Sequence, residues 1–176
     1  MPSKPIRVAI LALILGAIAL VVIYHAHDQR TIPAANLKPV PRGAPNLNQA
    51  DIEKMLGVER FQIVRRTRGV PLAVQLSFTN LTGFPFEMAD PGKNMLHDVI
   101  VPGLPARRLV FAGLSDDSVF LVYEQGGYVD TLNAVFFWFE QGGRNWGTTL
   151  TVSVNDVASL RAAIVAGNHR PWKEMN

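Results

Sequence analysis

Few side chains in this sequence have the types and spacing that chemistry requires. The chain has no cysteine and four histidines, which excludes disulfides, thiolate nucleophiles and thiolate-bound zinc. His25 and His27 follow an apolar N-terminal run, so His97 and His169 are the histidines of the main body. The sequence contains no glycine-rich phosphate loop, nucleophile elbow or histidine pair at helical spacing. We therefore predict no catalytic residue, no cofactor and no metal, and lean against an enzyme.

Three residues of one loop could together bind a soft metal ion. Met88, Met95 and His97 lie close in the sequence, and thioether and imidazole ligands suit a cuprous ion. Methionine in a loop more often fills a gap over a hydrophobic core. We therefore prefer the packing role for both methionines.

Glu124 and Glu140 occupy equivalent positions in a short repeat. Residues 119–127 and 135–143 both consist of an apolar, aromatic run followed by Glu-Gln-Gly-Gly. A pair of carboxylates can do acid–base work. If each glycine pair turns a strand, however, the two turns lie at opposite ends of the sheet. We expect two solvated strand ends rather than an acid–base pair.

Aromatic side chains gather in and around this repeat. In residues 135–139 both faces of a strand would be apolar. One face can join the core, and the other needs a second layer or a partner. A cover formed by residues 80–106 is the alternative to a partner. The residues predicted for partner binding are Tyr128, Phe137, Trp138 and Trp146.

The residue types of the repeat predict β-strands. Val, Phe, Tyr and Trp fit a pleated, half-buried surface better than a helix. Glycine tolerates the positive φ that both central positions of a type I′ turn need. Residues 126–127 are therefore predicted to form a two-residue turn that pairs Gln125 with Tyr128. That register makes 128–139 a long strand, with a bulge or break near Asn133.

The remaining segments complete an antiparallel sheet. Residues 72–79 show the clearest alternation of apolar and polar side chains and predict a half-buried strand. Further strands are predicted at 58–65, 107–113 and 148–154. Helices are predicted at 48–56, capped by Asn48, and from Asn155 or Asp156 to 166. The fold class is thus α+β, an antiparallel meander of about five to seven strands packed with one or two short helices.

Residues 80–106 form a long connection. Four prolines and three glycines interrupt it, so only a short strand at 98–101 or a helix at 94–97 is expected within it. A connection of this length is uncommon in a compact domain and is often functional. It supports an alternative function, a small-ligand-binding protein or enzyme whose site lies under this loop.

The N-terminal segment predicts membrane attachment. Residues 8–24 are uncharged and mostly aliphatic, and Lys4 and Arg7 precede them. The run is near the lower limit for crossing a bilayer and longer than the usual apolar core of a signal peptide. We predict that residues 1–26 form an uncleaved signal anchor that crosses the lipid bilayer through 8–24. A cleaved signal peptide is the alternative.

The positive-inside rule places the N-terminus in the cytoplasm and the rest of the chain outside, in the periplasm. A proline-rich linker is predicted at 27–47, a globular domain at 48–167 and a polar tail at 168–176. With a formal net charge of +3, the chain does not show the strongly basic character that is typical of a nucleic-acid-binding protein. The predicted function is a non-catalytic, envelope-facing binding or scaffolding domain on the inner membrane, with a protein partner in the cell envelope.

Overall fold

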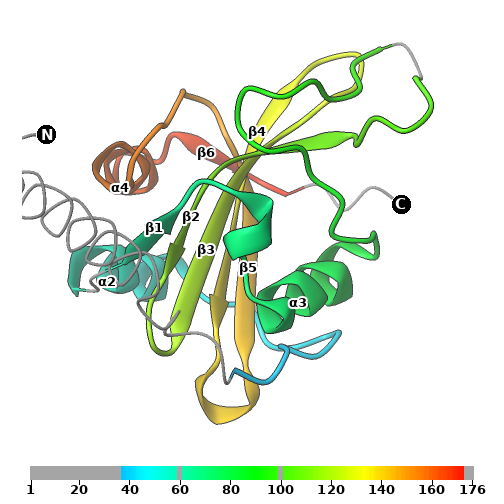
Figure 1. Cartoon of the computed structure of the whole chain (residues 1–176). Helices are drawn as coiled ribbons and strands as arrows, with labels where there is room; N and C mark the ends of the chain where they lie inside the picture. Colours follow the sequence, from blue (N-terminus) through cyan, green and yellow to red (C-terminus); the bar gives the residue numbers. More distant parts are fainter. Residues whose placement is uncertain (1–36, 59–60, 99–100, 173–176) are drawn as a thin grey trace, which may run out of the picture. The chain divides into compact units, whose positions relative to one another are not determined.

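The structure, a computed structural model, describes residues 37–58, 61–98 and 101–172. Their strands form one six-stranded antiparallel sheet in the order β1-β2-β3-β4-β5-β6, in which each strand pairs with the next in sequence (Figure 1). The strands are β1 (Gln62–Val64), β2 (Arg107–Leu114), β3 (Ser118–Gln125), β4 (Thr131–Trp138), β5 (Arg144–Leu150) and β6 (His169–Pro171). The helices of the described residues are α2 (Gln49–Val58), α3 (Leu72–Thr82) and α4 (Val157–Val165). The prediction of an α+β antiparallel meander is confirmed, with three helices in the described residues rather than one or two.

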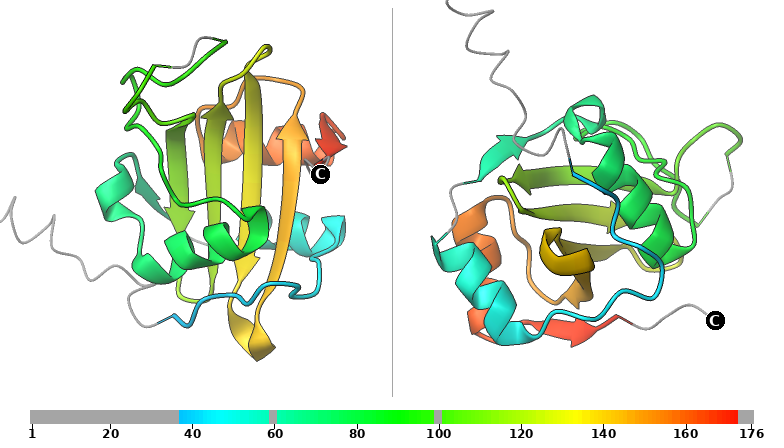
Figure 2. Two further views of the ribbon diagram at one scale, coloured as in Figure 1. Left: turned by 90° about the vertical axis from the view of Figure 1, so that its right-hand side faces the viewer. Right: turned by 90° about the horizontal axis from the view of Figure 1, so that it is seen from below.

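Helices cover both faces of this sheet (Figure 2). On one face, Phe120 and Phe136 pack with buried residues of α2 and α4. On the other face, α3 contributes Phe78, whose ring centroid lies 5.4 Å from that of Tyr123. The centres of β3 and β4 are therefore wholly buried on both sides. The apolar character of both faces of these strands is explained by a helical layer on each side.

The strand predicted at 72–79 is wrong, because this segment forms helix α3. The buried residues recur at helical spacing: Ala73, Val74, Ser77 and Phe78. Leu72 and Leu76, which belong to the predicted buried face of a strand, are 68% and 44% exposed. Pro71 precedes the first turn, where its missing N–H costs no hydrogen bond. Gly83 ends the helix with a φ of 74°, which is the usual left-handed C-terminal cap.

The connection between β3 and β4 is longer than predicted. Gln125 pairs with Thr131 rather than with Tyr128, so residues 126–130 form the turn. Gly126 and Gly127 are not among the glycines with positive φ, so the prediction of a type I′ turn is wrong.

The long strand with a break near Asn133 is also wrong. The β3–β4 register is continuous through this residue, and the shift in the sheet lies in β2, between Leu109 and Phe111.

The second glycine pair behaves differently from the first. Gly142 and Gly143 have positive φ angles of 92° and 85°, at the end of a 3-10 turn, Glu140–Gly142. The chain then enters β5, which begins earlier than the strand predicted at 148–154. Part of the predicted polar tail is ordered as well, because β6 pairs with the end of β5.

The predicted helix caps are present. The Asn48 side-chain oxygen accepts a hydrogen bond from the Asp51 N–H at 2.9 Å, and the Asp51 carboxylate accepts one from the Asn48 N–H at 3.2 Å. Asp156 caps α4 by accepting a hydrogen bond from the Ser159 N–H at 2.7 Å. These reciprocal bonds satisfy donors that a helix start leaves free.

The described part of the predicted linker, residues 37–47, lies against the domain. Val40 is buried, its N–H donates to the Ser77 hydroxyl at 2.8 Å, and its carbonyl accepts from the Asn80 amide at 2.8 Å. The Leu47 N–H donates to the Asn145 carbonyl of β5 at 2.7 Å. This stretch is thereby packed against both α3 and the sheet.

Within the described part of 80–106, residues 94–97 are not helical, and the strand expected at 98–101 falls partly outside the described residues. The predicted membrane span, 8–24, lies outside them entirely. None of the helices in the described part is long and apolar enough to cross a membrane.

The β3–β4 turn gives a matched pair of glycine substitutions. A Cβ at Gly126 would overlap the Leu96 carbonyl of the 80–106 loop, whereas a Cβ at Gly127 would meet open space. We predict that Gly126→Ala lowers the free energy of unfolding by about 1–3 kcal/mol, because backbone must move to make room. Gly127→Ala should unfold like wild type. Urea titrations followed by tryptophan fluorescence measure both, and equal midpoints for the two variants would contradict the docking of this loop on the turn.

Candidate ligand-binding cleft

A cleft of about 630 Å³ opens on the face of the sheet that α3 covers. It is bordered by the end of α3, by residues 42–46, by one end of strands β2 to β4 and by β5 from Asn145 to Thr149. Its volume lies in the range typical of small-molecule sites. The polar side chains that line the sheet side of the cleft are Arg107, Gln125, Thr131, Asn133, Asn145 and Thr149.

Strand register places five of these polar residues in two adjacent rows, whereas Asn145 lies further along β5, opposite Phe137. Arg107 pairs with Gln125, and Gln125 with Thr131. In the next row on the same face, Tyr123 pairs with Asn133, and Asn133 with Thr149. Directly opposite residues of antiparallel strands project from the same face. Two adjacent rows therefore form a polar area at the end of a sheet face whose centre is apolar.

Hydrogen bonds fix the orientation of the central amide. Asn133 donates to the Thr131 hydroxyl at 3.0 Å, and its side-chain oxygen accepts from the Thr149 hydroxyl at 2.9 Å. Asn133 is 2% exposed. Asn145 is also buried, so two strand asparagines border the cleft. Asparagine is depleted in strands, and this makes the pair an unusual feature of an otherwise apolar sheet.

Arg107 is the charged group of the sheet side of the cleft. The residue is 8% exposed, and its Nε has no hydrogen-bond partner among the described residues. The guanidinium lies over the rings of Phe78 and Phe84, 5.5 and 5.1 Å from their centroids. Burial lowers the pKa of Arg107, while Tyr123 and the exposed Glu87 act in the opposite direction. None of the ion pairs found among the described residues includes Arg107.

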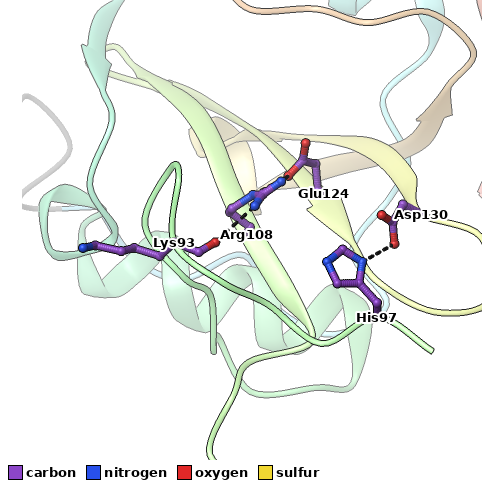
Figure 3. A network of polar contacts seen from close by, with 5 residues as sticks. All are labelled: Lys93, His97, Arg108, Glu124 and Asp130. Carbon is purple, nitrogen blue, oxygen red and sulfur yellow. Dashed lines mark hydrogen bonds and ion pairs between the residues drawn. The ribbon is translucent and has the colours of Figure 1, made fainter. Parts of the chain in front are cut away.

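Arg108, the next residue of β2, has the opposite environment. It projects from the other face of the sheet, where its guanidinium forms an ion pair with Glu124 (Figure 3). It also donates to the Lys93 carbonyl at 3.1 Å. Of two consecutive arginines, one is neutralised by a carboxylate and the other is buried beside the cleft without one.

Tyr123 adds a second unpaired polar group near Arg107. Its side chain is fully buried, and its hydroxyl has no hydrogen-bond partner among the described residues. Burial raises the pKa of Tyr123 far above its usual value, with a smaller opposing effect from Arg107. The phenol therefore stays protonated at physiological pH. Unpaired buried polar groups are rare in folded proteins and call for an explanation.

The residues predicted for partner binding are dispersed. Phe137 is fully buried in the core, and Tyr128 is fully exposed in the β3–β4 turn. Trp138 and Trp146 are partly buried against the core formed with α2 and α4. Tyr128 precedes β4 and Trp138 ends it, so the strand separates them.

Each tryptophan of this pair also contacts a polar side chain. The Arg144 guanidinium lies 4.7 Å from the centroid of Trp138 and forms an ion pair with Asp51 at 3.0 Å. The ring of His169 packs edge-on to Trp146 at 5.3 Å. Partner binding by these residues stays a prediction.

The other residues with candidate chemistry differ in their surroundings. Met95 is buried, whereas His97 is about half exposed and its Nδ1 lies 3.1 Å from the Asp130 carboxylate in the β3–β4 turn (Figure 3). Glu124, near the end of β3, and Glu140, after the end of β4, lie at opposite ends of the hairpin. Among the described residues, no three His, Asp or Glu side chains lie close enough to hold a metal ion.

The site predicted under the 80–106 loop corresponds to a different hollow. A second depression of about 600 Å³, more open to solvent, is lined by Gln75, by 86–88 and by 103–105. The cleft beside α3 contacts only the beginning of the 80–106 segment, at 80–84. Sequence reasoning missed Arg107, Asn133, Asn145 and Thr149 as site residues. The available signal was the placement of asparagine inside aromatic and β-branched strands.

Comparison of the chain with protein-family models, with curated proteins and with solved structures finds no match. The geometry of the cleft is therefore the basis for a function.

Substitutions of Arg107 and Arg108 are predicted to have different effects on the free energy of unfolding. Arg107→Met removes cation–π contacts that contribute about 0.5–1 kcal/mol each, but relieves a desolvation cost of roughly several kcal/mol for a buried ion without a counter-ion. We expect the free energy of unfolding to stay the same or to rise. Arg108→Met leaves Glu124 unpaired and should lower it by about 1 kcal/mol. Urea unfolding of both variants measures this, and a large loss for Arg107→Met alone would show that the guanidinium has a structural counter-charge.

Proposed function

We propose that this domain binds a small molecule in the cleft beside the end of α3. The observation that supports this proposal is that one cleft is lined by Arg107, Asn133 and Thr149, at one end of an apolar sheet face, and by Asn145 further along β5. A mostly apolar surface with a few convergent polar groups is the usual composition of a small-molecule site.

The stability cost of these groups supports the same proposal. A buried arginine without a carboxylate and a buried tyrosine hydroxyl without a partner both disfavour the folded state. Apolar side chains would fill these positions at lower cost. Residues that reduce stability in this way are characteristic of binding sites, where function and stability compete.

The lining residues favour binding over acid–base catalysis. The described residues that border the cleft include neither His, Asp nor Glu, the side chains that most often transfer protons near neutral pH. Amides, hydroxyls and guanidinium groups recognise and orient a ligand. This agrees with the absence of catalytic motifs from the sequence.

Occupancy of the cleft is tested by ligand-induced stabilisation. The full-length chain is screened by thermal melting against small metabolites, and a cleft ligand should raise Tm in proportion to its excess over Kd. Thr149→Tyr, which fills the cleft, should abolish the shift, whereas Thr151→Tyr, exposed beyond the end of β5, should retain it. Hits that bind both variants equally would place the binding elsewhere and contradict the proposal.

A second candidate is an envelope-facing domain with a protein partner, held at the inner membrane by residues 8–24. Its support is the apolar N-terminal run behind Lys4 and Arg7 and the turn at Tyr128 and Val129. These two side chains are 100% and 77% exposed, and exposed apolar groups of this size favour protein contacts.

The anchored arrangement is tested on cells with a C-terminal tag on the chain. Protease added to spheroplasts should degrade the tagged domain, because the positive-inside rule places it outside, and the mature N-terminus should begin at or next to Met1. A cytoplasmic protein of known location is the control for lysis. Protection of the tag would contradict the topology, and photo-crosslinking from position 128 that captures no protein would contradict a partner at this turn.

A further inference from the structure

We infer that the cleft binds a small organic monoanion, a carboxylate held by Arg107 against a flat apolar body. The inference rests on the proposed function and specifies its ligand. Three features of the cleft support it: the sign of the charges that border it, the number of those charges that are buried, and its apolar walls.

The charges that border the cleft have one sign. Among the described lining residues, Arg42 and Arg107 are the charged ones, and both are cationic. Glu87 influences Arg107 electrostatically but is exposed and makes no ion pair with it. A buried guanidinium is stable in a low-dielectric site when an anion pairs with it. Its planar set of donors matches the two oxygens of a carboxylate.

The number of buried charges favours a monoanion. Arg107 is buried, whereas Arg42 is exposed and stays screened by water. A single buried guanidinium neutralises one negative charge. A phosphate dianion in the same place would keep an uncompensated charge away from water, which is costly. The cleft is therefore better suited to a carboxylate than to a phosphate ester.

The apolar walls define the rest of the ligand. Phe84 lies under the Arg107 guanidinium, and the ring of Trp172 lies directly over Gly147 of β5, where a Cβ would overlap it. Both aromatic residues border the cleft. A flat ring can pack against such surfaces with offset or edge-on geometry. An aromatic or cyclic acid combines this body with the charged group that Arg107 requires.

Matched acid and amide pairs test the ligand class on the full-length chain. The probes are benzoate with benzamide, phenylacetate with phenylacetamide, and phenyl phosphate, each titrated by protein-observed NMR and by intrinsic tryptophan fluorescence. We expect at least one carboxylate to bind at least tenfold more tightly than its neutral amide and than phenyl phosphate. Binding of the acid should fall at least tenfold in Arg107→Met. It should be unchanged in Arg144→Met, where the arginine lies on the opposite face of the sheet.

Each outcome decides between the two proposals. Amides that bind as tightly as acids, with resonance shifts confined to cleft residues, overturn the monoanion and keep the small-molecule site. Tighter binding of phenyl phosphate overturns the carboxylate assignment. Failure of every carboxylate to bind at millimolar concentration overturns the inference, while hits from the wider metabolite screen would leave the proposed function intact. Near-UV circular dichroism of Arg107→Met verifies that the variant is folded.

Discussion

The burial of β3 and β4 on both faces is the constraint on which the rest of this fold depends. The central residues of these strands are inaccessible to solvent, and burying large aliphatic and aromatic side chains supplies the main driving force for folding. A single helical layer would leave one apolar face in water. Both apolar faces are covered, because α2 and α4 pack on one side of the sheet and α3 packs on the other (Figure 2). The sheet is therefore the middle layer of three.

The cleft forms where helix α3 no longer covers the sheet. Helix α3 ends at Gly83, and the residues just before and after this cap border the cleft. The strand rows beneath α3 are apolar, with Val135 and Leu121 paired at the centre. Beyond the helix end the rows change to polar residues, since water or a ligand must meet them there. The change occurs within single strands, between Val135 and Asn133 of β4.

Local patterns predicted the elements whose stability is mainly local. The strand character of β3 and the caps at Asn48 and Asp156 follow from residue type and from short-range hydrogen bonds. The failures have tertiary causes. Leu72 and Leu76 imitate an alternating strand because both are exposed on α3, whose buried stripe includes the polar Ser77. This serine is buried because it bonds both to its own helix and to Val40, which no local pattern records.

The cleft residues were hidden from sequence analysis for the same reason. Asn133 and Arg107 border the same cleft only through the register of β2, β3 and β4. Gly126 presents a similar case. Its glycine pair resembles a tight turn, yet its lack of a side chain is required by the Leu96 carbonyl of a distant loop. These requirements on residue type arise from contacts between segments far apart in the chain, so the periodic pattern of a single segment cannot reveal them.

The C-terminal strand joins the cleft to the edge of the sheet. The pairing of Pro171 in β6 with Thr148 in β5 carries Trp172 back across the sheet to lie over Gly147. Any larger residue at 147 would displace the ring, so glycine in the middle of a strand, normally unfavourable, is explained by the close approach of the indole. One wall of the cleft is therefore formed by Trp172. Its position depends on the short β5–β6 pairing, so the shape of the cleft depends on the attachment of β6 to the sheet.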